Sequence, residues 1–142
     1  MSFPFNVRVY GILICDGHIL LSHETIKDFS FTKLPGGGLE FGEGTADCVV
    51  REFLEETTLN VEVIRHVYTT DFFQASAFDE NHQVISIYYL LEAEGLDKPR
   101  PIEAQEANQE FEWVRLRELD ESHFTFPIDK KLVPELKRLG EE

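Results

Sequence analysis

Apolar and polar residues alternate along the chain in segments that predict strands first and helices later. Residues 7–15 are β-branched and apolar, and a second apolar run covers residues 18–23. Between them stands Asp16-Gly17, the strongest short-range signal for a hairpin between two strands. Residues 24–33 mix polar and aromatic side chains without a clear period, so we expect an exposed loop there.

The second half of the chain predicts further strands and a final helix. Residues 61–74 and 84–94 have strand patterns on either side of a turn, which suggests an antiparallel pair. Residues 110–116 predict a short strand, and residues 127–139 have helical spacing, with Pro134 either starting the last helix or kinking it. This order indicates an α+β fold with a mixed sheet covered by helices, in a single domain spanning residues 1–142.

The charge balance limits the classes of partner. Thirteen basic and 27 acidic residues leave a formal charge of −14, which opposes binding to a nucleic acid polymer. The chain has neither an apolar run of about 20 residues nor the pattern of a secretory signal, so we expect a cytoplasmic protein without a membrane partner. Cys15 and Cys48 lie in apolar segments, which is typical of reduced core residues. A phosphate-bearing substrate would need local help, which a divalent cation can supply.

Three glycines and a group of glutamates stand close together in GGGLEFGEGTADCVVREFLEETTL, residues 36–59. Thr45 is the expected N-cap of a helix on which Glu52, Glu55 and Glu56 share one arc beside an apolar face. Such a group is usually a solvated acidic surface. The glycines favour another interpretation, because they let the backbone approach a ligand closely and offer a carbonyl oxygen. Hard divalent cations prefer oxygen ligands, so the segment predicts a Mg²⁺ or Mn²⁺ site.

The same segment matches the Nudix box, and the chain therefore resembles a Nudix hydrolase of the MutT-like kind. The matching residues are Gly37, Glu43 after five residues, the run Arg51-Glu52-Phe53-Leu54-Glu55-Glu56 after seven more, and Leu59. One position departs from the pattern, because Thr58 stands where the family has glycine. A β-branched residue suits a left-handed helix end poorly, so we expect Asn60 to take that conformation instead. The order of strands likewise resembles the Nudix fold, an α/β/α sandwich with a central mixed β-sheet.

The resemblance implies roles for the residues at matching positions. Glu52, Glu55 and Glu56 would hold one or more magnesium or manganese ions and act as the catalytic carboxylates, with Glu52 or a neighbour activating the attacking water. The carbonyl of Gly36, just before the first glycine of the motif, would add a backbone ligand. These roles are implied by the family and do not follow from spacing alone.

Further roles concern the loop and the far side of the cleft. Arg51 and Glu43 would form a structural ion pair that fixes the loop to the helix. A fourth carboxylate often comes from a loop across the cleft in this family. Glu106 and Glu110 are the candidates, and Glu110 is our choice because it adjoins the strand at 110–116.

Residues for the substrate are less specific. Arg8, His23 and Lys33 lie near expected strand ends and could bind phosphate, although each alone is typical of a surface residue. Aromatic side chains could stack on a base, and candidates follow the box: Phe72, Phe73, Phe78, Tyr88 and Tyr89. Adjacent strand residues point to opposite faces, so at most one of the adjacent pair Phe72 and Phe73 can face the cleft.

The implied reaction is hydrolysis of the pyrophosphate linkage of a nucleoside diphosphate linked to another group X. The partner would be a small nucleotide-derived substrate, and a homodimer is possible. No proline follows the box before Pro99, which counts weakly against ADP-ribose. The alternative is a Nudix-like domain that binds or senses a nucleotide derivative without turnover.

Overall fold

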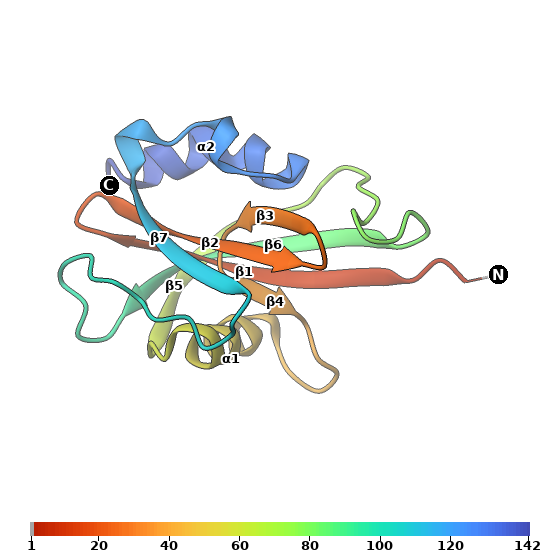
Figure 1. Cartoon of the computed structure of the whole chain (residues 1–142), viewed down its shortest axis with the longest axis horizontal. Helices are drawn as coiled ribbons and strands as arrows, with labels where there is room; N and C mark the ends of the chain where they lie inside the picture. Colours follow the sequence, from red (N-terminus) through yellow and green to blue (C-terminus); the bar gives the residue numbers. More distant parts are fainter. Residues whose placement is uncertain (1) are drawn as a thin grey trace.

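The computed structural model describes residues 2–142 as a sheet between two helices (Figure 1). Helix α1 lies against one side of the strands in Figure 1 and helix α2 against the other. This arrangement confirms the expected α+β class and the mixed sheet of the α/β/α sandwich. The elements are β1 (Phe5–Cys15), β2 (His18–Ile26), β3 (Phe29–Lys33), β4 (Gly36–Gly38), α1 (Thr45–Thr57), β5 (Val61–Thr69), β6 (Gln83–Ala93), β7 (Gln109–Arg115), two 3₁₀ turns (Leu116–Glu118 and Glu121–His123) and α2 (Pro127–Leu139).

The sheet is mixed because β1 pairs in parallel with β6, whereas its other pairings are antiparallel. The strand order is β3-β2-β1-β6-β5, with β4 paired to β1 and β7 paired to β2. The expected hairpin is confirmed: Asp16 and Gly17 turn with φ of 48° and 73°, and Cys15 pairs with His18. Positive φ at both positions gives the turn that matches strand twist. The expected antiparallel pair is also confirmed as β5 and β6.

The expected exposed loop over residues 24–33 is wrong. Strand β2 continues to Ile26, a turn follows at Lys27 with φ 56°, and β3 then pairs antiparallel with β2. Phe31 and Lys33 are buried on one face of β3, while Thr32 lies on the other. The charge of Lys33 hides this alternation in the sequence, because a lysine is seldom buried without a partner.

Helix α1 packs on the sheet through a face whose buried residues are Cys48, Val49, Phe53 and Thr57. The close approach requires Gly11 on β1, because a Cβ there would overlap the ring of Phe53. The expected N-cap at Thr45 is wrong. Gly44 is the N-cap without a side-chain hydrogen bond, and the Thr45 hydroxyl instead pairs with the hydroxyl of Tyr89 at 2.6 Å. Helix and sheet are therefore joined by a polar contact at the point where the helix begins.

The end of α1 also differs from expectation. Thr58 itself takes the left-handed conformation, with φ 63° and ψ 7°, and its N–H donates to the carbonyl of Leu54. The proposed shift to Asn60 is therefore wrong. Next to it, Thr57 donates to the carbonyl of Phe53 and accepts from the N–H of Leu59, so two side-chain hydrogen bonds hold the turn.

Helix α2 covers the opposite face of the sheet with an apolar stripe of Ile128, Leu132, Val133, Leu136 and Leu139. It begins at Pro127, in the first turn where a missing N–H is harmless, and Pro134 lies inside it. Pro134 therefore does not start the helix. Cys15 and Cys48 are free and buried, as expected. None of the helices within residues 2–142 has the length and apolar character that a membrane crossing requires.

Candidate functional site

The glycine strand and the acidic helix are packed directly against each other. Strand β4 pairs with β1, with Gly37 opposite Val9 and Gly36 opposite Tyr10. A Cβ on Gly37 would lie 2.5 Å from the carboxylate of Glu52, so only glycine leaves room for that carboxylate. Gly36 has φ 150°, and a Cβ there would overlap the backbone of Val9. The glycines therefore allow β4 to lie against β1 on one side and Glu52 on the other.

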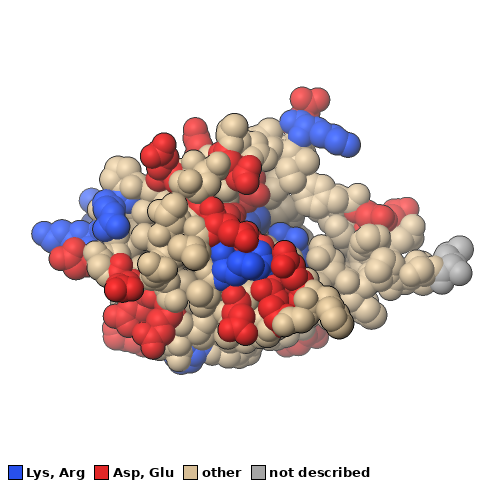
Figure 2. All heavy atoms as spheres, turned by 90° about the horizontal axis from the view of Figure 1, so that it is seen from below, with Lys and Arg blue, Asp and Glu red and all other residues tan. Residues whose placement is uncertain are grey.

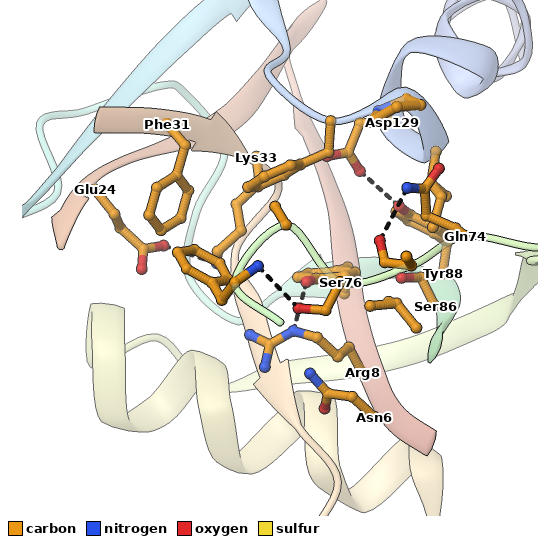
Figure 3. A pocket seen from close by; sticks show the side chains of 18 of the residues that line it. Asn6, Arg8, Glu24, Phe31, Lys33, Gln74, Ser76, Ser86, Tyr88 and Asp129 are labelled. Carbon is orange, nitrogen blue, oxygen red and sulfur yellow. Dashed lines mark hydrogen bonds and ion pairs between the residues drawn. The ribbon is translucent and has the colours of Figure 1, made fainter. Parts of the chain in front are cut away.

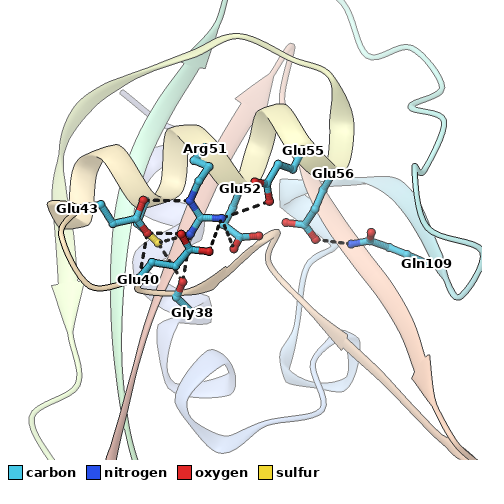
Figure 4. A network of polar contacts seen from close by, with 9 residues as sticks. Gly38, Glu40, Glu43, Arg51, Glu52, Glu55, Glu56 and Gln109 are labelled. Carbon is cyan, nitrogen blue, oxygen red and sulfur yellow. Dashed lines mark hydrogen bonds and ion pairs between the residues drawn. The ribbon is translucent and has the colours of Figure 1, made fainter.

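Arg51 lies at the centre of the acidic group (Figure 4). Its guanidinium donates to both oxygens of Glu43, at 2.7 and 3.0 Å, so the two residues of the expected ion pair are in contact. It also donates to Glu52 at 3.1 Å and Glu55 at 3.2 Å, and to the carbonyl of Gly38. Seen from the α1 side, acidic side chains surround a small basic patch (Figure 2). Arg51 thereby offsets much of the repulsion among the carboxylates.

The charges around Arg51 shift pKa values in the direction that this network requires. The hydrogen bond from Arg51 lowers the pKa of Glu43 to about 2, and the same pair raises the pKa of the guanidinium. Burial, with the neighbouring Glu43, raises the pKa of the Cys48 thiol to about 12, so Cys48 is a neutral core residue. The loop that carries Glu43 is therefore fixed to α1 by a charged hydrogen-bonded pair at neutral pH.

Glu56 points away from this network, toward strand β7 (Figure 4). Its Oε1 accepts from the side-chain amide of Gln109 at 2.7 Å, and its Oε2 is buried without a hydrogen-bond partner in the described structure. Burial raises the pKa of Glu56 to about 7, against the opposing effects of Lys33 and of the Gln109 hydrogen bond. A buried carboxylate oxygen without a partner is costly, and a bound cation would satisfy it.

Within residues 2–142, no three His, Cys, Asp or Glu side chains are already placed to hold one metal ion. Glu52 and Glu55 are turned to Arg51, and Glu56 is turned to Gln109. The residues nevertheless fit a hard divalent cation, since the donors are all oxygens, one buried oxygen is unpaired and Gly37 makes room for Glu52. A cation would require the carboxylates of Glu52 and Glu55 to exchange Arg51 for the metal.

A cavity of about 290 Å³ is lined by residues of β1, β2, β3 and β6, by the segment 74–78 and by the start of α2 (Figure 3). Arg8 from β1 and Lys33 from β3 both line it. The Arg8 Nε donates to the hydroxyl of Tyr10 at 2.7 Å, and Lys33 pairs with Glu24 at 2.7 Å. Burial lowers the pKa of both basic groups, but Tyr10 and nearby carboxylates outweigh it, so both pKa values are raised and both groups stay charged. The cavity is therefore lined by two fixed, positively charged side chains.

The cavity is also lined by aromatic rings and by a buried acid. Phe31, Phe78 and Phe126 line it and contact one another at ring-centre distances of 5.4 to 6.5 Å. Asp129 at the start of α2 is 4% exposed and accepts from the Tyr88 hydroxyl at 2.5 Å. Burial raises the pKa of Asp129 to about 6. Aromatic rings together with a polar group in one cavity can hold a flat ring system.

Among the aromatic residues that the sequence suggested, Phe78 and Tyr88 line the cavity. Phe72 packs beneath Lys131 and Phe73 is 72% exposed, so neither faces the cavity. Tyr89 points to α1, where it meets Thr45.

His23 and Glu110 lie on the faces of their strands opposite to Ser22, Glu24 and Gln109. On β2, Ser22 and Glu24 face Gln109 and Lys33, so His23 between them points to the other side. There it contacts Thr32 and Glu112. On β7, Glu110 is exposed and alternates with the buried Gln109, which is the residue that reaches Glu56. In this structure His23 does not line the cavity and Glu110 does not contact the box carboxylates, so neither residue enters the proposal below.

The structure adds residues that the sequence interpretation missed: Ser22, Glu24, Phe31, Gln109 and Asp129. Gln109 adjoins the predicted strand, and extending the alternation of β7 by one residue could have identified it as the inward neighbour of Glu110. Nothing in the sequence signals that Asp129 is buried, because an acid in the first turn of a helix is ordinary there.

The chain is similar to known proteins over nearly its whole length. The family model described as NUDIX domain matches residues 4–136. The chain belongs to the NUDIX family. Members of this family are typically pyrophosphohydrolases and generally use divalent metal ions.

Solved structures share the fold at low sequence identity. A MutT protein from Methanosarcina mazei Go1 has 20% identity and a TM-score of 0.76, covering 100% of this chain and 99% of that one. An ADP-ribose pyrophosphatase from Streptococcus suis has 22% identity and a TM-score of 0.62, covering 96% and 90%. A bifunctional NMN adenylyltransferase/ADP ribose pyrophosphatase from Francisella tularensis, complexed with AMP and a Mn ion, has 21% identity and a TM-score of 0.72, covering 98% and 43%.

Proposed function

We propose that this NUDIX chain is a metal-dependent hydrolase that cleaves the pyrophosphate linkage of a nucleoside diphosphate linked to another group X. The main support is that the positively charged side chains of Arg8 and Lys33, which line the cavity, are near the box carboxylates. Arg8 is within electrostatic range of Glu52, and Lys33 within range of Glu56. A diphosphate bound between the aromatic side chains and the carboxylates would therefore contact the positive charges of Arg8 and Lys33.

Glu52, Glu55 and Glu56 would hold magnesium or manganese, with a glycine carbonyl of β4, for which Gly36 is the candidate. When bound, the metal would neutralise phosphate oxygens and lower the pKa of a bound water. Arg8 and Lys33 orient the diphosphate, and their pairing with Tyr10 and Glu24 keeps them fixed before substrate arrives. Glu52, whose carboxylate lies against Gly37 of β4, is our candidate for accepting the proton of the attacking water.

The remaining elements of the proposal concern the setting. We infer one catalytic domain over residues 1–142, a small nucleotide-derived substrate as the partner, and a cytoplasmic location. The net charge of −14 supports the absence of a nucleic acid polymer among the partners. A homodimer remains compatible with this proposal.

The test is phosphate release from a panel of nucleoside diphosphate derivatives with Mg²⁺ or Mn²⁺, coupled to a phosphatase. We expect Glu52→Gln and Glu56→Gln each to lower kcat/KM by at least about a hundredfold, as for loss of a metal ligand or base. Glu62→Gln, an exposed glutamate on β5, is the matched control and should act as wild type. Retained activity in both box variants would refute the assignment. Tight binding of a nucleotide without release would indicate the sensor instead.

A further inference from the structure

Gln109 is a buried side chain of β7 that contacts the box carboxylate of Glu56. It stands at the start of β7 and is 5% exposed. Its side-chain nitrogen donates twice, to Glu56 Oε1 at 2.7 Å and to Ser22 Oγ at 2.9 Å. A buried amide with both hydrogens used is a fixed group, because any rotation would leave a donor unsatisfied.

The chemistry of the neighbours fixes which end of the amide faces Glu56. Glu24 is paired with Lys33 at 2.7 Å and is therefore a carboxylate that can only accept. Ser22 consequently donates its proton to Glu24, at 2.9 Å, and its oxygen is left to accept. Only the nitrogen end of the Gln109 amide can supply that hydrogen bond. The second N–H of the same nitrogen is then directed at Glu56.

The result is a chain of oriented hydrogen bonds from the cavity to the metal-site candidate: Lys33, Glu24, Ser22, Gln109 and Glu56. At its end, Oε1 of Glu56 is occupied and Oε2 is buried without a partner. A carboxylate held by one oxygen in this way presents the other oxygen in a fixed direction.

We propose that Gln109 is a positioning residue that holds Glu56 by one oxygen and so presents the other to a divalent cation. This inference rests on the proposed function only for the identity of the cation, since the hydrogen bonds exist without it. In this proposal Gln109, instead of the neighbouring Glu110, is the residue of β7 that acts on the metal site. A donor is needed at this position, because a carboxylate there would face the carboxylate of Glu56.

The test measures Mn²⁺ binding without substrate, by the electron paramagnetic resonance signal of free Mn²⁺. Gln109→Met keeps the length of the side chain and removes both donors, and we expect Mn²⁺ affinity to fall about tenfold or more. Ser22→Ala removes the group that orients the amide and should weaken binding in the same direction by a smaller factor. Glu110→Gln, the adjacent residue on the opposite face, is the matched control and should bind as wild type. Circular dichroism checks that each variant is folded.

A double-mutant cycle separates positioning from a general loosening of the site. If Gln109 acts through Glu56, then adding Gln109→Met to Glu56→Gln should change Mn²⁺ affinity by less than about twofold. The inference is overturned if folded Gln109→Met binds Mn²⁺ within twofold of wild type, or if the two effects multiply. It is also overturned if the wild-type chain binds no Mn²⁺. If Mn²⁺ binds as expected but no nucleotide is hydrolysed, the proposed function fails and the role of Gln109 stands.

Discussion

At the scale of single residues, Thr58 holds a backbone conformation that its side chain disfavours. Its φ is 63°, and the side chain is exposed, so few contacts offset the strain. A left-handed residue with a Cβ costs about 1–2 kcal/mol, whereas glycine adds about 0.5–1 kcal/mol of chain entropy on folding. We therefore expect Thr58→Gly to raise the free energy of unfolding by about 0.5–1 kcal/mol, measured by urea titration. Thr58→Ala keeps a Cβ and should gain less. Equal or lower stability of Thr58→Gly would contradict this explanation.

Asp129 should make stability depend on pH. Its pKa is raised by burial from 3.8 to about 6, so the folded chain binds this proton more tightly than the unfolded chain. The free energy of unfolding contributed by this group is therefore fully present below pH 4 and decreases as the pH rises toward 6. The loss is on the order of 2–3 kcal/mol.

The variant Asp129→Asn should remove this part of the pH dependence. Asparagine stays neutral and can still accept from Tyr88, so its stability relative to wild type should rise between pH 4 and pH 6.5. Urea unfolding at several pH values measures the difference. Glu56, whose pKa is also raised, is unchanged in both proteins and cancels from the comparison. A difference independent of pH would show that Asp129 binds its proton equally in the folded and unfolded chain, which would contradict the raised pKa.

At the scale of elements, the contact between β4 and α1 has a tolerance that differs from one glycine to the next. A Cβ on Gly37 would lie 2.5 Å from the carboxylate of Glu52, whereas a Cβ on Gly38 would meet only Arg8, at 3.7 Å. Neither glycine has a positive φ, so alanine fits both backbones. We expect Gly37→Ala to displace Glu52 and to lower Mn²⁺ affinity and kcat/KM at least about tenfold, with little change in unfolding free energy. Gly38→Ala should stay within about threefold of wild type. Similar losses in both variants would show that β4 tolerates no side chain at all.

The elements also show what a sequence can reveal and what it cannot. The hairpin at Asp16-Gly17 follows from local turn chemistry, and the arc of Glu52, Glu55 and Glu56 follows from helical periodicity. Both are local, and both are present in the structure. Local patterns do not show which side chains of β7 are directed at α1. A shift in register by one residue would exchange all side chains between the two faces of the strand. The sequence alone therefore cannot distinguish Glu110 from Gln109 as the residue that reaches Glu56.

Strand β3 is hard to predict from the sequence for a related reason. Lys33 and Glu24 look like solvated charges when each is considered alone, but they form an ion pair at 2.7 Å on adjacent strands, with Lys33 buried and Glu24 partly buried. Their partnership depends on the β2–β3 register, which places Ser22 opposite Lys33 and Glu24 opposite Phe31. Long-range pairing of this kind leaves no local trace in the sequence.

At the scale of the whole molecule, the excess of acid is concentrated where the fold can use it. The formal charge is −14. Arg51 alone is within 4 Å of four carboxylates, those of Glu40, Glu43, Glu52 and Glu55. One guanidinium cannot neutralise that many charges, and Glu56 keeps a buried oxygen without a partner. The folded chain is therefore destabilised locally in a way that a divalent cation would relieve, whereas the unfolded chain has no such assembled group.

This difference predicts that Mg²⁺ or Mn²⁺ stabilises the metal-free protein. A ligand that binds only the folded state adds about 2.7 kcal/mol at a hundredfold excess over its dissociation constant, and EDTA should reverse the gain. Urea unfolding with increasing Mn²⁺ measures it. Sodium chloride at equal ionic strength controls for general screening of the acidic surface, and Glu62→Gln controls for loss of one remote charge. In Glu56→Gln the rise should largely disappear, because the buried oxygen that needs a cation is gone. An equal rise in that variant, or with sodium chloride alone, would mean that the cation acts on the overall charge and not at the box.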